Sequence, residues 1–388
     1  WRGGVIENKE LDVIWPVGMR GTEDRPFTFP QGTTPAKRAE TFRDVIREQV
    51  AMTKELVPKD KAPLFHFTMY NEMLPAYQAN PAAFDLPEDV MIIWPDDNDG
   101  HMRGLPSGLG KWKHGVYYHL AYLGGRLSKQ LTHVVNPKTV AEQFDKIVKS
   151  GATEYMLVNV SELRDYVMTA RMVADITWDA ASHSADEYTN WWAREYFGVR
   201  TTAVADAYRK YFTLLDSPDK FWIAPDAVED LVDALYKKVA GESYAPFPAE
   251  KLSLLKSRDS QLGAAFSEAT VARSLSSLTR SQSLFYDTDV LLGLTVAERQ
   301  TAAALDLEEA LRASDTEQMW SRVFSAFGDL EIVEDTLRAS EYPPFDRWYQ
   351  ESWIRSALSF NNPHRPHNQV RAFIGNEGHG KLVRMGQR

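Results

Sequence analysis

Polar side chains that could catalyse a reaction follow each of five apolar, strand-like segments. They are Arg20 and Asp24, then Asn71 and Glu72, then Asp96, Asp97 and Asn98, then Tyr118 and His119, and finally Asn159 and Glu162. In a parallel α/β fold the carboxyl ends of the strands meet at one edge, and that edge carries the active site. One such carboxylate could be a solvated loop residue. A carboxylate or amide at nearly every strand end indicates a catalytic face.

The residue types at these positions favour acid–base hydrolysis of a glycosidic bond. That reaction needs one carboxyl group that stays protonated and one that is ionised. Asparagine and histidine side chains nearby would bind sugar hydroxyls. Arg20 is suited to a substrate carboxylate, because a guanidinium group holds a carboxylate through two parallel hydrogen bonds. Arg20 could also pair with Asp24, four residues later, and the two roles are compatible.

Other kinds of site are disfavoured by the sequence. The glycine-rich stretch at 104–112 lacks the spacing of a phosphate loop, and Trp112 stands where a metal-binding Ser or Thr should be. The DDNDG stretch at 96–100 lacks the first and last carboxylates of a calcium loop. The nine histidines show no metal-ligand spacing, and there is no nucleophile elbow and no cysteine. We therefore predict neither a metal nor a cofactor.

The first half of the chain alternates strand-like and helix-like segments. Predicted strands cover residues 11–19, 64–70, 90–94, 116–120 and 155–160. Thr34-Pro35 predicts the start of one helix and Asn136-Pro137 the start of another, which Gly151 ends. Near-continuous apolar strands separated by helices indicate a parallel sheet covered by helices. An open doubly wound sheet and a TIM-like (β/α) barrel both fit, and a barrel would have lost its first strands before Trp1.

From about residue 184 the apolar residues recur at helical spacing and strand signals are absent. We predict three parts. Residues 1–183 form a (β/α)-barrel catalytic region that is incomplete at its amino end. Residues 184–360 form an all-α helical bundle. Residues 361–388, which are rich in Asn, His, Gly and Arg, form a linker or the edge of a further domain.

Composition and charge narrow the range of partners. The net charge is −10 and no basic run is present, which argues against nucleic acid and anionic membrane surfaces. No stretch of about 18 apolar residues is present to span a membrane. The chain starts at Trp1 without a visible signal peptide, so it looks processed, trimmed or incomplete. The sequence does not decide the cellular compartment, although a secreted or periplasmic location is slightly favoured. It does not decide the oligomeric state either, and a homodimer is one alternative.

At these residues the chain resembles glycoside hydrolase family 115. The resemblance covers roughly residues 11–180 and rests on five motifs in the same order. They are Gly18-Met19-Arg20-Gly21 with Asp24, Glu72 in MYNEM, the acidic turn at 87–89 followed by Asp96-Asp97-Asn98, the Gly115–His119 segment with Tyr122, Gly124 and Gly125, and Val158-Asn159-Val160.

The resemblance implies an inverting xylan α-1,2-glucuronidase built on a TIM-like barrel and a helical bundle. Its substrate would be glucuronoxylan or its oligosaccharides, from which it would remove (4-O-methyl)glucuronic acid. By position Glu72 would be the general acid, and Asp24 and Asp96 compete for the role of base. Asn98, Tyr118, His119 and Asn159 would bind the sugar, and Arg20 would bind its carboxylate.

The sequence departs from the family pattern beside these residues. Asp99 replaces a Trp, Ala121 replaces an Asp, and the stretch at 161–165 replaces Gly-Asp-Leu-Lys-Pro. The family's chains are also longer at both ends. Two alternatives therefore stay open: a glycosidase that acts on another glycan with the same scaffold, and a catalytically degenerate carbohydrate-binding relative.

Overall fold

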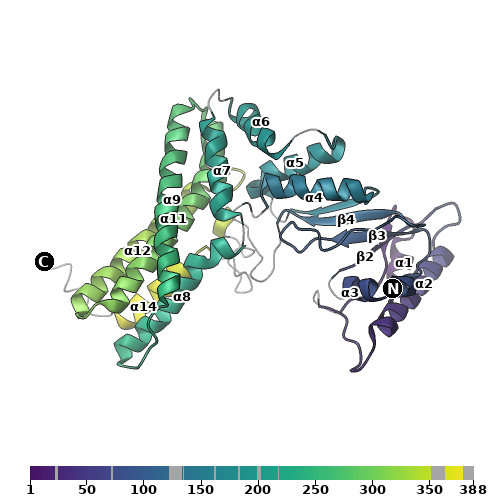
Figure 1. Ribbon diagram of the computed structural model, residues 1–388, viewed down its shortest axis with the longest axis horizontal. Helices are drawn as coiled ribbons and strands as arrows, with labels where there is room; N and C mark the ends of the chain where they lie inside the picture. Colours follow the sequence, from purple (N-terminus) through teal and green to yellow (C-terminus); the bar gives the residue numbers. More distant parts are fainter. Residues whose placement is uncertain are drawn as a thin grey trace. The chain divides into compact units, whose positions relative to one another are not determined.

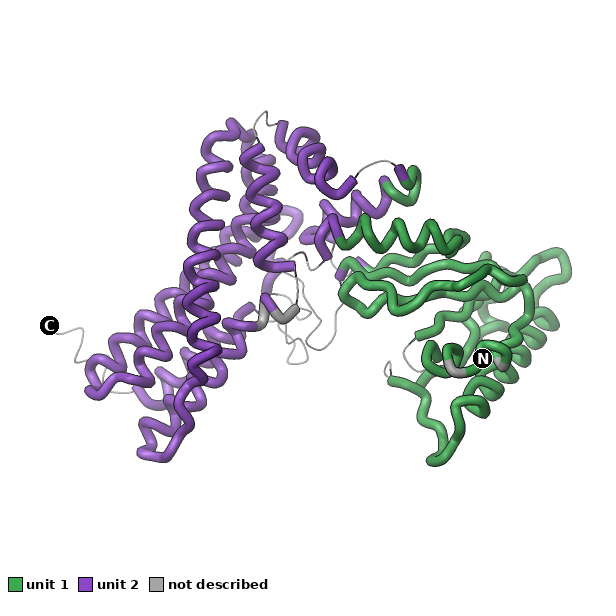
Figure 2. Tube along the Cα trace, viewed as in Figure 1, with its two compact units in different colours: residues 1–120, 139–159, 176–180 green, residues 121–138, 160–175, 181–388 purple. Residues whose placement is uncertain are grey.

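The computed structural model (Figure 1) describes residues 1–21, 25–70, 73–121, 133, 135–160, 163–181, 184–198, 202–216, 218–350 and 363–378. These residues form two compact units (Figure 2). Unit 1 contains residues 1–120, 139–159 and 176–180, and unit 2 contains residues 121–138, 160–175 and 181–388. The predicted domain boundaries at 183 and 360 stay predictions.

Unit 1 is built on a parallel sheet of five strands. The strands are β1 (Ile14–Pro16), β2 (Leu64–Thr68), β3 (Val90–Pro95), β4 (His114–His119) and β5 (Met156–Asn159), and they lie in the same order in space as in the chain. All six residues of β3 are buried, as expected for a central strand that is covered on both faces. The five predicted strands and their parallel arrangement are confirmed. The sheet is consistent with part of an α/β barrel.

Helices connect and cover the strands of unit 1. They are α1 (Arg2–Asn8), α2 (Pro35–Leu56), α3 (Met73–Ala79), the 3₁₀ turn η1 (Pro81–Phe84), and α4 (Pro137–Ser150), which unit 1 contains from residue 139. Helix α2 begins where predicted, because the Thr34 side chain accepts a hydrogen bond from the Lys37 amide. The Phe84 ring packs between Phe42 of α2 and Phe67 of β2, with centroids 6.3 and 6.0 Å away. These contacts attach α2 to the sheet.

Gly115 allows β4 and β5 to approach each other. A Cβ atom at this position would lie 2.3 Å from the carbonyl oxygen of Tyr155. We expect Gly115→Ala to lower the free energy of unfolding by about 3 kcal/mol or more, because backbone must shift to admit the methyl group. Urea denaturation measures this loss. The matched control is Gly263→Ala in helix α9 (Ala249–Leu275), where nothing lies within 4 Å and a gain of roughly 0.5–1 kcal/mol is expected. Equal stability of the two variants would contradict the prediction.

Unit 2 is helical in its described parts. It contains η3 (Leu163–Tyr166), α5 (Val167–Trp178, to residue 175), α6 (Ala185–Phe197), α7 (Ala203–Leu215), α8 (Pro218–Ala240), α9, α10 (Arg280–Tyr286), the π-helical turn η4 (Asp287–Leu291), α11 (Leu292–Arg312), α12 (Thr316–Ala339), η5 (Trp348–Gln350) and α14 (Arg365–Glu377). Figure 1 shows the long helices α8, α9, α11 and α12 side by side. Their shared core includes Leu231, Leu255, Leu307 and Val323, all buried. The predicted helical region is confirmed.

Part of the segment predicted as a linker forms a packed helix, α14. Val370 and Phe373 enter the core, where the Phe373 ring stacks 5.4 Å from that of Trp320. His364, which precedes α14, places its Nδ1 atom 2.5 Å from Oε1 of Glu334 on α12. Val370 and Phe373, three residues apart, anchor a helix that is otherwise mostly polar. The predicted linker or domain edge at 361–388 stays a prediction. The described residues contain no helix long and apolar enough to cross a membrane.

Asp165 is a carboxyl group inside unit 2. It accepts hydrogen bonds from the Tyr349 hydroxyl at 3.0 Å and from Trp348 Nε1 at 3.3 Å. Burial raises the pKa of Asp165 to about 6, although the positive charge of Arg164 and both hydrogen bonds lower it. The folded state therefore holds the proton of this group more tightly than the unfolded chain does.

This raised pKa predicts a specific pH dependence of stability. Between the ordinary pKa of 3.8 and the folded value of about 6, the free energy of unfolding falls as the pH rises, and above that window the contribution is constant. The decline from this one group is roughly 3 kcal/mol. Asp165→Asn takes up no proton, so subtracting its stability from that of the parent at pH 4, 5, 6 and 7 isolates the effect. A difference that does not change with pH would contradict the prediction.

Candidate active site

The turn after β1 presents Arg20 at the carboxyl edge of the sheet. Gly18 adopts φ 119°, and a Cβ there would lie 3.1 Å from the Phe67 ring. The Gln49 side chain fixes this turn, since it accepts from the Gly18 amide at 2.7 Å and donates to the Gly18 carbonyl at 3.0 Å. The Arg20 guanidinium carbon lies 4.6 Å from the centroid of the Tyr70 ring, which follows β2. This distance is that of a cation–π contact.

Asp96 and His119 form a buried pair at the ends of β3 and β4. Nδ1 of His119 lies 2.6 Å from Oδ1 of Asp96, and the His119 amide donates to Oδ2 at 2.8 Å. The Asn98 amide donates to Oδ1 at 3.0 Å. Both side chains of the pair have no exposed surface. Both carboxylate oxygens of Asp96 are therefore used to hold His119 and the turn at Asn98.

The same contacts fix the tautomer of His119. A carboxylate oxygen accepts only, so the proton of a neutral imidazole in this pair is on Nδ1, and Nε2 is an acceptor. Asp96 thus acts on the site through the orientation of His119.

Asn98 is held in an unusual backbone conformation. Its φ is 70°, in the left-handed region that Asn tolerates better than most residues. The Tyr70 hydroxyl donates to its Oδ1 at 3.0 Å, which links the end of β2 to the loop after β3. Asp97 shapes the same loop, because its Oδ1 accepts from the amides of Asp99 at 2.9 Å and His101 at 3.0 Å.

Tyr117, His119 and Asn159 lie on one face of the sheet. Residues two apart in a strand share a face, and His119 is the register partner of Asn159. The rings of Tyr117 and His119 are 4.3 Å apart, and the Asn159 Nδ2 donates to the Tyr117 hydroxyl at 3.3 Å. Tyr70 is also close to Tyr117, with ring centroids 6.3 Å apart.

Tyr118 lies on the opposite face. Its ring packs edge-on against Phe144 of α4 at 5.1 Å, and its hydroxyl donates to the Gly100 carbonyl at 2.9 Å. Burial, reinforced by the negative charges of Asp96, Asp97 and Asp99, raises the pKa of Tyr118 well above its ordinary value. The structure therefore does not bring Tyr118 to the predicted sugar-binding group, and its role there stays a prediction.

The structure brings together five of the predicted site residues, and two others lie outside its described part. The group contains Arg20, Asp96, Asn98, His119 and Asn159. Glu72 and Asp24, the predicted acid and one candidate base, lie outside the described residues. Among the described residues, no group of three or more His, Asp or Glu side chains is placed to hold a metal ion.

Tyr70 and Tyr117 join the group and were missed from the sequence. Strand alternation could have identified Tyr117, because a residue two positions before His119 shares its face. With its two tyrosines, two amides, histidine and arginine, the group can bind sugar hydroxyls and a carboxylate.

Glycoside hydrolases resemble this chain in sequence and in fold. The family model described as glycosyl hydrolase family 115 matches residues 1–219. The structure of BtGH115A, described as a family GH115 4-O-methyl-alpha-glucuronidase with specificity for decorated arabinogalactans, is similar with a TM-score of 0.60 and 19% identity. That match covers 86% of this chain and 44% of BtGH115A, so the chain spans less than half of that relative.

A second similar structure is that of a protein described as a GH138 enzyme targeting pectin rhamnogalacturonan II. Its TM-score is 0.49 at 8% identity, over 90% of this chain and 60% of the other. No curated protein matches the chain. The family model covers more than half of the 388 residues and includes every residue of the candidate site. The chain belongs to glycoside hydrolase family 115.

Proposed function

We propose that this chain carries the catalytic region of a glycoside hydrolase that removes (4-O-methyl)glucuronic acid side groups from xylan. The observation that carries the proposal is the group at the sheet edge, where Arg20, Tyr117, His119 and Asn159 lie at the ends of neighbouring parallel strands. A guanidinium group supports recognition of a uronic acid, because it pairs with a carboxylate in two places. The hydroxyl and amide groups suit the remaining sugar hydroxyls.

The proposed reaction is a single displacement by water with inversion. Glu72 donates a proton to the leaving oxygen while a second carboxylate removes a proton from the attacking water, and the two carboxyl groups stand ~6.5–9.5 Å apart in such enzymes. The contacts of Asp96 favour Asp24 as the base, because both Asp96 oxygens already accept hydrogen bonds within the protein. Asp96 is then a positioning residue for His119.

The architecture that fits this reaction is a TIM-like barrel. Sequential parallel strands joined by helices, with the polar group at their carboxyl ends, support the proposal that the five-stranded sheet is part of such a barrel. The helices of unit 2 would form the accompanying bundle.

A second candidate is cleavage of the same sugar from a different polysaccharide. BtGH115A is described as specific for decorated arabinogalactans, and this chain has Asp99 and Ala121 beside the site. The main chain of the substrate is expected to contact such loop residues, whereas the uronic acid contacts the strand ends.

One assay distinguishes the two candidate functions by their polysaccharide substrates. The chain is incubated with glucuronoxylan oligosaccharides and, in parallel, with glucuronic-acid-decorated arabinogalactan, and the free uronic acid is quantified by chromatography. Release from the xylan substrate supports the first candidate, and release from arabinogalactan alone supports the second. A folded chain that releases uronic acid from neither would contradict both.

Tyr117 offers a direct test of the group. Its hydroxyl bonds to Asn159 and lies beside His119, so we expect Tyr117→Phe to raise KM and lower kcat/KM by about tenfold, the usual cost of one lost polar contact to substrate. The matched control is Tyr118→Phe. Its buried hydroxyl bonds only to Gly100 among the described residues, so that change should cost about 1 kcal/mol of stability and leave kcat/KM nearly unchanged. A larger loss of kcat/KM in Tyr118→Phe than in Tyr117→Phe would contradict the proposed site.

A further inference from the structure

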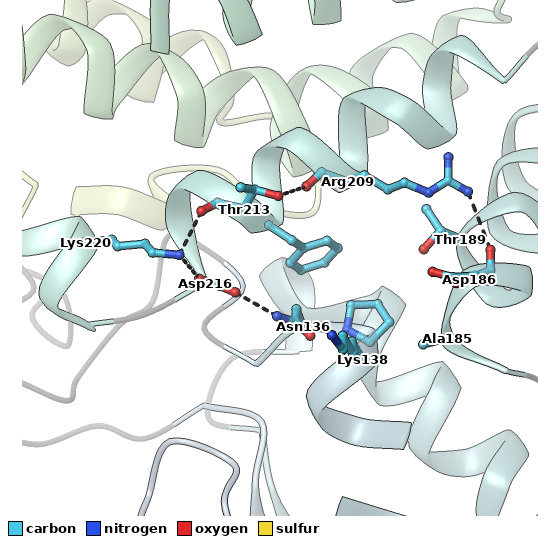
Figure 3. A pocket seen from close by; sticks show the side chains of 11 residues that line it. Asn136, Lys138, Ala185, Asp186, Thr189, Arg209, Thr213, Asp216 and Lys220 are labelled. Carbon is cyan, nitrogen blue, oxygen red and sulfur yellow. Dashed lines mark hydrogen bonds and ion pairs between the residues drawn. The ribbon is translucent and has the colours of Figure 1, made fainter. Parts of the chain in front are cut away.

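A pocket in unit 2, outside the sheet-edge group, is large enough for a small molecule. Its volume is about 370 Å³, at the lower end of the range for small-molecule sites. Figure 3 shows its lining, which contains Asn136, Pro137, Lys138, Ala185, Asp186, Thr189, Arg209, Phe212, Thr213, Asp216 and Lys220. All of these residues belong to unit 2.

Three cationic side chains from three different helices line this pocket. Lys138 comes from α4, Arg209 from α7 and Lys220 from α8 (Figure 3). The lining contains two carboxylates, Asp186 and Asp216, so its formal charge is positive in a chain whose net charge is −10. A positive concave site in an acidic protein favours an anionic ligand.

The starts of three helices add to this positive potential. Pro137 and Lys138 are the first residues of α4, Ala185 and Asp186 are the first residues of α6, and Lys220 is the third residue of α8. Each helix is at least 13 residues long, and a helix start carries a partial positive charge and amides without helical acceptors. They add to the charge of the three cations, of which Arg209 is paired with Asp206 and Lys220 with Asp216.

The polar groups of the pocket are held in place by one another. The Lys220 ammonium donates to the Thr213 carbonyl at 2.8 Å and to Asp216 Oδ1 at 2.6 Å. Asp216 Oδ2 accepts from Asn136 Nδ2 at 2.7 Å. These links connect α7 to the starts of α4 and α8 and fix the geometry before a ligand arrives, which lowers the entropic cost of binding.

Arg209 is fixed in a similar way on the α6 side. Its guanidinium donates to Asp206 Oδ1 at 2.7 Å and to Asn190 Oδ1 at 2.8 Å. The side chain of Arg209 keeps 37% of its surface exposed, so part of the group faces solvent. Figure 3 shows Arg209 reaching toward Asp186 across the pocket from Lys220.

From these observations we infer that the pocket binds a small hydroxylated carboxylic acid, of the class of a single sugar acid. Lys138, Lys220 and the helix starts take the carboxylate. The amide of Asn136, the hydroxyls of Thr189 and Thr213 and the carboxylate of Asp186 take hydroxyl groups, which both donate and accept. The inference does not depend on the proposed function, because none of these residues belongs to the sheet-edge group.

Ligand-observed NMR titration of the whole chain tests the inference with D-glucuronate, D-glucose and inorganic phosphate as probes. We expect glucuronate to bind, and glucose and phosphate to bind at least about tenfold more weakly. Glucose lacks the carboxylate, and phosphate lacks the hydroxyl groups of a sugar. The titration is repeated in a His119→Ala background, so that binding at the sheet edge cannot be mistaken for binding in the pocket.

Two variants locate the binding. Lys220→Gln and Lys138→Gln should each weaken glucuronate binding about tenfold, the effect of a lost charge-assisted contact. Lys251→Gln, which removes an exposed cation paired with Asp230 on the same unit, is the matched control and should change nothing. Thermal melts check that every variant is folded. Equal binding of all three probes, no binding of glucuronate, or binding that persists in both folded pocket variants would each overturn the inference.

Discussion

Glu72→Gln should lower kcat roughly 10²- to 10⁴-fold on any glycan that the chain hydrolyses, because a positioned proton donor contributes that much to a hydrolysis. Glutamine has the shape of glutamate and cannot supply the proton to the leaving oxygen. The measurement is release of free uronic acid from oligosaccharides under saturating substrate, with KM recorded beside kcat.

A substrate with a better leaving group serves as a control for this prediction. An aryl glycoside needs little help from an acid, so the variant should recover much of its activity on such a compound if Glu72 is the donor. Glu48→Gln, at an exposed position on α2, is the matched control and should act like the parent. Full activity of Glu72→Gln on the natural glycan would remove this residue from the mechanism.

Asp96→Asn should lower kcat/KM by about 10²-fold or more. The two carboxylate oxygens of Asp96 now accept from Nδ1 of His119, from the His119 amide and from the Asn98 amide. An asparagine side chain would replace one of these acceptor oxygens by an NH₂ donor. One of these donors would face another donor, or His119 would take its other tautomer, and a histidine in the wrong tautomer loses its catalytic orientation. A buried unsatisfied group also costs about 1–3 kcal/mol of stability.

The pH profile separates orientation from simple loss of stability. If Asp96 sets the state of His119, kcat/KM of the Asn variant should depend on pH differently from that of the parent at temperatures where both are folded. Asp97→Asn is the matched control. Its carboxylate is partly exposed, accepts the amides of Asp99 and His101, and has its Oδ2 3.6 Å from Nδ1 of His101 in the same loop, so a small effect on kcat is expected. Equal pH profiles for parent and Asp96→Asn would show that Asp96 is a structural residue only.

The elements of this fold could be read from local sequence signals. The helix start at Thr34-Pro35 and the apolar stretch VMIIW are both short-range features, and each appears where it was predicted. The gathering of Arg20, His119 and Asn159 at one edge also follows from sequence, because parallel strands place their carboxyl ends together.

The orientation and contacts of single side chains could not be read in this way. Tyr118 and His119 are neighbours in the chain, yet the pleat sends them to opposite faces, and the choice depends on the packing of Phe144. Asp96 looked like a candidate base, and only its three hydrogen bonds show that it is engaged within the protein. The packing of α14 depends on partners distant along the chain, such as Glu334 and Trp320.

The matching order of strands in space and in sequence has a consequence for how this enzyme family can diversify. Each strand contributes its own residues to the site and is followed by its own loop. The site residues therefore lie on separate segments of the sequence. A change such as Asp99 after β3 alters what lies next to that strand without moving Arg20 after β1 or Asn159 after β5. Under the proposed function, evolution could exchange the recognised polysaccharide one loop at a time, while the residues that bind the removed sugar stay the same.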